Sequence, residues 1–198
     1  MVLSGPPDPA AHAELVRITG LPAEQLEKLY WADRLAFDAG EVSGQEFWRR
    51  IAREAGLKLD EAAIENLVRW DSRMWMTVNG RMLDWQRKLK EHGVRTGIIS
   101  NLGDTVHEAM MHEFPWLSRF DVLVWSYQLH LIKPNAAIYR YALERLGTLA
   151  GETLFIDDKQ ANVDAAIAIG MKGLVFTTVD KLRADLIAAG LDTELPLP

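Results

Sequence analysis

The sequence predicts an α/β fold, in which a parallel sheet is covered by helices and a small helical bundle precedes most of the sheet. From about residue 81 onward, short apolar segments alternate with helical segments, as in parallel α/β proteins. Before about residue 75, every periodic segment has helical spacing. The length of 198 residues, 48% of them hydrophobic, suits one domain, or one domain with a small insert.

The first half is expected to form about four helices. Ser43, with Glu46 three residues later, resembles a capping box at the start of one helix. Asp60 is expected to cap the next helix through its carboxylate. No strand-like run interrupts these segments, so the stretch is interpreted as a helical bundle.

The second half is expected to contribute strands over residues 94–99, 122–125, 154–156 and 174–176. The helices between and after them are expected to end at Gly147, Gly170 and Gly190, because glycine is the preferred residue just past a helix end. Ligands of such sheets bind beyond the carboxyl ends of the strands, so functional residues are expected there.

Composition narrows the function classes. The chain has 22 basic and 28 acidic residues, a net charge of -6 and no block of Lys and Arg, which argues against non-specific nucleic-acid binding. It has no cysteine, which excludes disulfides and thiolate chemistry. No stretch approaches the ~18 apolar residues that span a bilayer. A soluble cytoplasmic protein without nucleic-acid or membrane partners is therefore expected.

Polar groups come directly or shortly after three of the predicted strands. Ser100 and Asn101 come after the first, Lys133 shortly after the second, and Asp157 and Asp158 after the third. Taken alone, Ser and Asn are most often turn or cap residues, and a lysine is most often solvated. Two adjacent carboxylates are better explained by a cation, either Mg²⁺ or a nearby lysine. Together the set offers the donors, the fixed positive charge and the metal ligands that phosphoryl chemistry needs.

Three motifs in order resemble the haloacid-dehalogenase-like (HAD-like) hydrolases. Residues 97–101 (GIISN) resemble the second motif of that family, residues 131–139 (LIKPNAAIY) the third, and residues 155–166 (FIDDKQANVDAA) the fourth in its phosphatase form. Residues 40–48 (GEVSGQEFW) are typical of the family's small caps. The resemblance implies a Rossmann-like parallel sheet core over residues 1–8 and 81–198, with a helical cap over residues 9–80.

The resemblance also implies site roles. Ser100 and Lys133 would be the catalytic residues, Ser100 binding the phosphate and Lys133 neutralising the nucleophile and the transferring group. Asp158 would be the direct ligand of a Mg²⁺ cofactor, with Asp157 orienting Lys133 or a metal-bound water. Asn101 is a weaker candidate for phosphate contact. The expected partner is a small phosphorylated molecule.

The chain departs from the family's sequence pattern at its N-terminus. Residues 2–5 (VLSG) match the segment just after the first motif, whose aspartate is the nucleophile, so that aspartate would lie about three positions before Met1. Asp8 lies in a proline-rich loop and is a poor substitute. The expectation is a truncated first strand, negligible phosphatase activity of this exact chain, and a natural product that starts upstream. Unpaired neighbours of that strand would cost stability unless they pair with another chain, such as the second copy in a homodimer.

Two other functions stay open. A truncated member could serve as a non-catalytic binding or oligomerisation module. A 2-haloacid dehalogenase is disfavoured, because that chemistry needs no metal and the Asp157 and Asp158 pair favours one. Substrate identity depends on cap aromatics, and which of Trp31, Phe37, Trp48 and Trp75 face the site cannot be derived from their spacing.

Overall fold

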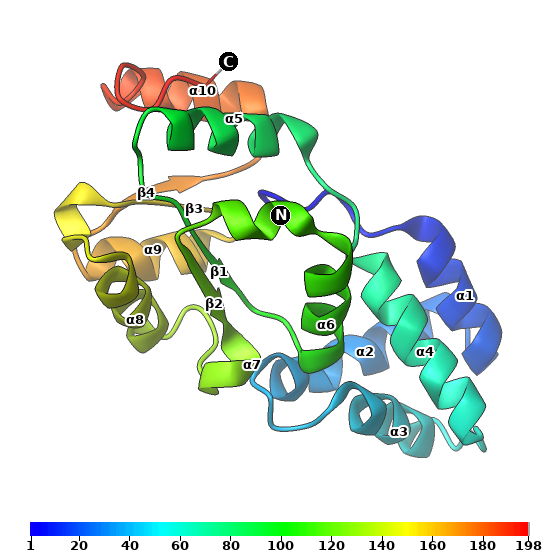
Figure 1. Cartoon of the computed structure of the whole chain (residues 1–198). Coiled ribbons are helices and arrows are strands. Elements are labelled where there is room, and N and C mark those ends of the chain that lie inside the picture. Colours follow the sequence, from blue (N-terminus) through cyan, green and yellow to red (C-terminus); the bar gives the residue numbers. More distant parts are fainter. Residues whose placement is uncertain (198) are drawn as a thin grey trace.

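The structure is a computed structural model that describes residues 1–197 (Figure 1). Its first half is helical, with α1 (Pro9–Thr19), α2 (Ala23–Asp38), α3 (Gly44–Glu54) and α4 (Glu61–Met74). The carboxylate of Asp8 caps α1 and that of Asp60 caps α4, while the hydroxyl of Ser43 accepts from the Glu46 amide at the start of α3. The predicted four helices and the caps at Ser43 and Asp60 are therefore confirmed.

The second half alternates helices with parallel strands. Its elements are α5 (Gly80–Glu91), β1 (Gly97–Ser100), α6 (Asp104–Glu113), a 3-10 turn (Pro115–Arg119), β2 (Val122–Trp125), α7 (Ser126–Leu129), α8 (Ala136–Leu146), a second 3-10 turn (Ala150–Glu152), β3 (Leu154–Asp157), α9 (Gln160–Ala168), β4 (Lys172–Val175) and α10 (Val179–Ala188). The predicted order of strands and helices is confirmed. The first strand is shorter than expected and begins at Gly97.

The strands form two separate pairs instead of one continuous sheet. β1 pairs with β2 in a register that joins Ser100 to Trp125, and β3 pairs with β4 in a register that joins Asp157 to Val175. Within residues 1–197, no strand links β1 to β3. A single parallel sheet was predicted, and the structure shows the parallel strands without the central strand that would join them.

The N-terminal segment does not take that central place. Ser4 forms an isolated antiparallel bridge with Val78, the Leu3 carbonyl accepts from the Asn79 amide, and the Gly5 amide donates to the Thr77 carbonyl. These bonds tie the segment to the linker between α4 and α5, so its backbone is not shared with β1 or β3.

Three apolar cores hold the elements together. The largest lies in the helical half and continues beneath α6 and the end of β2. A second joins α5 to α10, and a third joins α8 and α9 to β2 and β3. α5 and α10 lie together at one side of the strands, and α8 and α9 at the other (Figure 1).

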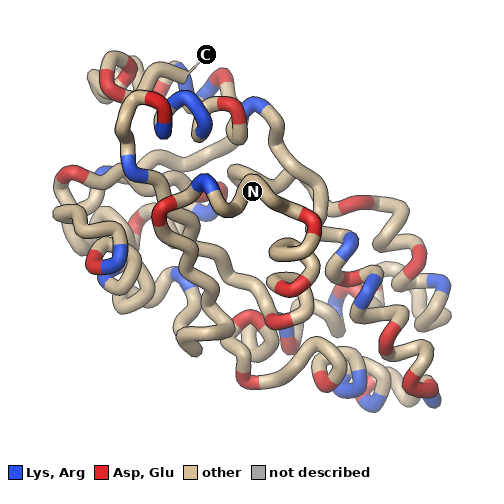
Figure 2. Tube along the Cα trace, viewed as in Figure 1, with Lys and Arg blue, Asp and Glu red and all other residues tan. Residues whose placement is uncertain are grey.

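Lys and Arg are interspersed with Asp and Glu on most helices, with uncharged stretches between them (Figure 2). Figure 2 shows no segment of the described chain dominated by Lys and Arg. Among the described residues, no helix is long and apolar enough to cross a bilayer.

Candidate functional site

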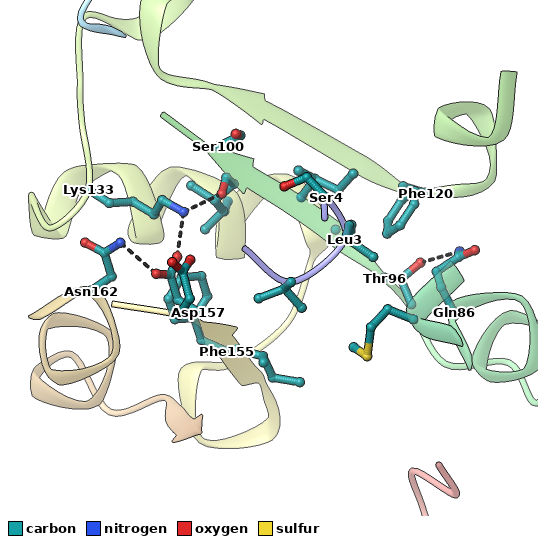
Figure 3. Close-up of a pocket in the computed structure, with 18 of the residues that line it drawn as sticks. Leu3, Ser4, Gln86, Thr96, Ser100, Phe120, Lys133, Phe155, Asp157 and Asn162 are labelled. Atoms are coloured by element: carbon teal, nitrogen blue, oxygen red, sulfur yellow. Dashed lines mark hydrogen bonds and ion pairs between the residues drawn. The ribbon is translucent and has the colours of Figure 1, made fainter. Parts of the chain in front are cut away.

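The ends of β1 and β3 meet at a buried ion pair. The Lys133 Nζ lies 2.7 Å from the Asp157 Oδ2 and donates to the Ile99 carbonyl at 2.8 Å (Figure 3). The two side chains are only 11% and 6% exposed, so the pair is largely shielded from solvent. A lysine from the loop between α7 and α8 is therefore fixed between the ends of two strands that are not paired with one another.

Asp157 is held by Lys133 and by two further donors. Its Oδ1 accepts from the Lys159 amide and from the Asn162 Nδ2, each at 2.9 Å. Burial alone would raise the pKa of Asp157, but the charge of Lys133 and these hydrogen bonds outweigh burial and lower that pKa below its ordinary value. The carboxylate is thus ionised and has both oxygens engaged, which suits an orienting role better than direct binding of a metal.

Asn101 fixes the backbone at Lys133. Its Nδ2 donates to the Lys133 carbonyl at 3.0 Å, and its Oδ1 accepts from the Lys133 amide at 2.8 Å. Both ends of the side-chain amide are engaged in this way. Contact of Asn101 with phosphate stays a prediction, because it would require one of these bonds to be shared or broken.

Ser100 is the last residue of β1 and lines the same cavity as Lys133 and Asp157 (Figure 3). Its side chain is half-buried, and its hydroxyl has no hydrogen-bond partner among the described residues. That hydroxyl remains available to a ligand in the cavity.

Asp158 lines the same cavity, with a side chain that is 42% exposed. Its Oδ1 lies 2.6 Å from the amino group of Met1, a cation. Residues 1–197 contain no cluster of three or more His, Cys, Asp or Glu side chains that could enclose a metal. Mg²⁺ commonly binds through one or two carboxylates together with substrate phosphate and water, and Asp158 fits that sparse donor set.

Asp8, the first acidic residue of the chain, has a structural role. Its carboxylate accepts from the Ala10 amide at 2.9 Å and caps α1. It does not line the cavity that holds Lys133 and Asp158.

The cavity has a volume of about 1150 Å³ and extends from the helical half to the space between β1 and β3. Trp31 and Trp75 line it from the helical half, with ring centroids 6.4 Å apart. Phe37 and Trp48 are fully buried in the core instead. The structure thus separates the four candidate aromatics into two that face the cavity and two that do not.

A buried ionic network that contacts Trp75 was not predicted. Arg34 Nε donates to Asp38 Oδ1 at 2.8 Å, and its Nη1 lies 3.5 Å from Asp71 Oδ1, which accepts from the Tyr30 hydroxyl at 2.7 Å. Burial alone would lower the pKa of Arg34, but the charges around it raise that pKa. The signal in the sequence was the spacing of four residues between Tyr30, Arg34 and Asp38, which places all three on one side of α2.

The helical half is joined to the strand ends by Ser126. Its hydroxyl donates to the Asp38 carbonyl at 2.5 Å and accepts from the Leu102 amide at 3.0 Å. Nearby, Gly103 lies against Phe37, so closely that an added Cβ would lie 2.0 Å from the ring. The end of α2 therefore packs directly on the loop that comes after Ser100.

Comparisons with known proteins agree with this geometry. Residues 78–176 match the family model described as haloacid dehalogenase-like hydrolase. Phosphatase MT3486 of Mycobacterium tuberculosis is 30% identical over 186 residues, covering 89% of this chain and 83% of that protein. Sesquiterpene phosphatase astK of Aspergillus oryzae is 29% identical over 142 residues, covering 71% of this chain and 70% of that protein.

A solved structure shares the fold. It is a HAD family enzyme from Bacteroides thetaiotaomicron, in complex with magnesium and inorganic phosphate, with a TM-score of 0.74 at 21% identity and 89% coverage of both chains. The family model and the relative that is 30% identical carry the family assignment, and the solved structure shows the same fold. The chain belongs to the haloacid dehalogenase-like hydrolase family.

Proposed function

We propose that the chain contains the phosphate- and metal-binding part of a Mg²⁺-dependent phosphatase for a small phosphorylated molecule. The observation that supports this most is the buried pair of Lys133 and Asp157, which fixes one ammonium group beside Ser100 and Asp158 in a single cavity. The relatives named as phosphatases, and the magnesium and phosphate of the related Bacteroides structure, support the same chemistry.

Each residue has a distinct role in this proposal. The free hydroxyl of Ser100 donates to a phosphate oxygen, and the Lys133 ammonium neutralises the charge of the phosphoryl group. Asp158 is the protein ligand of Mg²⁺, which would balance phosphate charge when bound. Asp157 keeps Lys133 in place and in its charged form, so it acts as a positioning residue.

Binding without turnover is the expected behaviour of this chain. A phosphatase of this family needs an aspartate free to attack phosphorus. Among the described residues at the site, Asp157 is hydrogen-bonded at both oxygens and Asp158 is assigned to the metal, while Asp8 caps α1. We therefore expect phosphate binding with negligible hydrolysis. A division into residues 1–8 and 81–198 as core and 9–80 as cap is part of the proposal.

Isothermal titration calorimetry with inorganic phosphate tests this, with and without Mg²⁺. Phosphate should bind about tenfold more tightly with Mg²⁺, and Asp158→Asn should remove that gain. Ser100→Ala should weaken phosphate binding in both conditions. Asp164→Asn, an exposed change outside the cavity, is the matched control and should behave as wild type.

Two results would contradict the proposal. Phosphate binding that is absent, or that is unaffected by both Asp158→Asn and Ser100→Ala, would remove the assigned site. Mg²⁺-dependent hydrolysis of p-nitrophenyl phosphate that is abolished by Asp158→Asn would leave the site intact but refute the expected lack of turnover.

A further inference from the structure

The C-terminal end of α2 is fixed beside the proposed phosphate site. The carbonyl of Asp38, the last residue of α2, accepts from the Ser126 hydroxyl at 2.5 Å. The same hydroxyl accepts at 3.0 Å from the amide of Leu102, which lies two residues after Ser100. A single side chain thus joins this end of α2 to the loop that begins at Ser100, so a ligand held at Ser100 lies close to the last turns of α2.

The face of α2 that borders the cavity is mainly apolar. Four of its residues line the cavity, namely Trp31, Arg34, Leu35 and Asp38. The two charged side chains are only 6% and 11% exposed and are paired with each other at 2.8 Å. Trp31 and Leu35 are instead 50% and 63% exposed, and their spacing of four residues places them on one side of the helix. A ligand that lies along α2 therefore meets an indole ring and a leucine side chain.

Trp75, which directly follows α4, extends this apolar surface. Its ring lies edge-on to that of Trp31, with centroids 6.4 Å apart and planes at 78°. Its Nε1 donates to the Tyr30 hydroxyl at 3.1 Å and to the Asp71 Oδ1 at 3.3 Å, and both of these partners are buried. The ring is therefore held in place before a ligand binds, which lowers the cost of ordering it. We call Trp31, Leu35 and Trp75 the apolar wall.

The rise of the helix sets how far the apolar wall extends from the phosphate site. At 1.5 Å per residue, Leu35 lies about 4.5 Å and Trp31 about 10.5 Å along the helix axis from Asp38. The wall thus begins about one turn from the strand ends and continues for about one turn more. A short group attached to a bound phosphate would reach only Leu35, whereas a longer one would also reach the two indole rings.

We propose that the molecule bound in this cavity is the phosphate monoester of an apolar alcohol. Its phosphate lies at Ser100 and Lys133, and its hydrocarbon part lies along the apolar wall, so Trp31 and Leu35 determine specificity. The inference rests on the proposed phosphate site and adds the class of alcohol to it. Hydrocarbon gains by leaving water for such a wall. A polyhydroxylated alcohol would lose its water there and find few hydrogen-bond partners among ring faces and a leucine side chain.

Isothermal titration calorimetry on the full chain tests this with three ligands in the presence of Mg²⁺. They are inorganic phosphate, ethyl phosphate and octyl phosphate, the last at concentrations where it is monomeric. Each fully buried CH₂ strengthens binding about fourfold, so partial burial of the longer chain should make octyl phosphate bind about thirtyfold more tightly than ethyl phosphate. The double variant Trp31→Ala/Leu35→Ala should reduce this preference about tenfold.

Two controls separate the apolar wall from the phosphate site and from the rest of the surface. Binding of inorganic phosphate should be the same in the double variant as in wild type, which also shows that the variant is folded. Ile187→Ala removes a side chain that is 57% exposed on α10 and does not line the cavity. This variant should keep the full preference for octyl phosphate. Ser100→Ala should weaken all three ligands, because each carries the phosphate.

Several results would overturn the inference. If inorganic phosphate binds but octyl phosphate binds no more tightly than ethyl phosphate, the phosphate site stands and the apolar alcohol is wrong. A preference that survives in Trp31→Ala/Leu35→Ala, or that Ile187→Ala abolishes, would place the hydrocarbon elsewhere. Tighter binding of glycerol phosphate or phosphocholine than of octyl phosphate would assign a polar or a cationic group to the indole rings. Failure of all ligands to bind, inorganic phosphate included, would refute the proposed function as well.

Discussion

The helical half and the strand half of this chain differ in how completely their apolar side chains are buried. In the helical half, Phe37, Phe47 and Trp48 are each fully buried, and the rings of Phe37 and Phe47 stack 5.0 Å apart. In the strand half, Ile99 and Ile156 lie beside a cavity and remain half-buried. The contrast shows that the core between the helices of the first half is complete, whereas the sheet in the second half is not.

The largest expected effect tests this contrast directly. Phe47→Ala should lower the free energy of unfolding by about 4 kcal/mol, because it opens a cavity in a closed core. Ile156→Ala should cost about 1–2 kcal/mol, since its side chain already borders empty space and keeps part of its contact with solvent. Urea unfolding of both variants measures the difference. Equal losses would mean that the surroundings of Ile156 are as well packed as the helical core.

Lys133→Met should have the next largest effect on stability. It leaves the buried carboxylate of Asp157 without its cation and should lower the free energy of unfolding by about 3 kcal/mol. Adding Asp157→Asn should recover part of the loss, because a neutral amide is cheaper to bury. A single variant as stable as wild type would show that the ion pair is open to solvent.

Gly103→Ala tests how closely the two halves fit. The new Cβ would lie 2.0 Å from the Phe37 ring, so either α2 or the loop after β1 must move, at a cost of about 2 kcal/mol. Gly80→Ala is the matched control, because an added Cβ there meets nothing within 4 Å. Urea unfolding measures both variants, and the control should be neutral or slightly stabilising. If Gly103→Ala left the free energy of unfolding unchanged, the Phe37 ring or the loop after β1 would be able to shift at little cost.

The smallest effect is a dependence on pH. The pKa of Asp157 is lower in the folded chain than its unfolded value of about 3.9, so its stabilisation is present above that value. The stabilisation is lost as the pH falls through the folded pKa, because the carboxylate then takes up a proton. Urea unfolding at pH 6 and at pH 3 should therefore show a smaller drop in stability for Asp157→Asn than for wild type. An identical drop would assign the acid sensitivity to other groups.

The alternation of strands and helices could be predicted well from the sequence, because apolar runs and terminating glycines are local signals. A gap in the sheet was also predicted, since the residues around Val2 match a segment that normally comes just after a strand. The pairing of Leu3 and Ser4 with the linker before α5 was not predicted, because that choice depends on which backbone groups remain free in three dimensions.

The sequence allowed the residues of the candidate site to be predicted, but fewer of the hydrogen bonds and ion pairs between them. Strand-end positions identified Lys133 and Asp157, and their contact results from the convergence of parallel strand ends. Both bonds of Asn101 to the Lys133 backbone, and the network around Arg34, depend on side-chain packing. Helical spacing alone also could not separate Trp31 from Trp48, because both lie on amphipathic helices.

The two unpaired strand edges also affect how the chain meets other molecules. Exposed sheet edges invite edge-to-edge aggregation, and proteins commonly protect them with charges, prolines or covering segments. Here the free edges of β1 and β3 are turned inward, toward the same cavity and beneath the helices that cover the strands. The unpaired edges therefore border the same cavity as Lys133 and Asp158, together with Val2 and Leu3 of the N-terminal segment, and do not form the outer rim of a sheet.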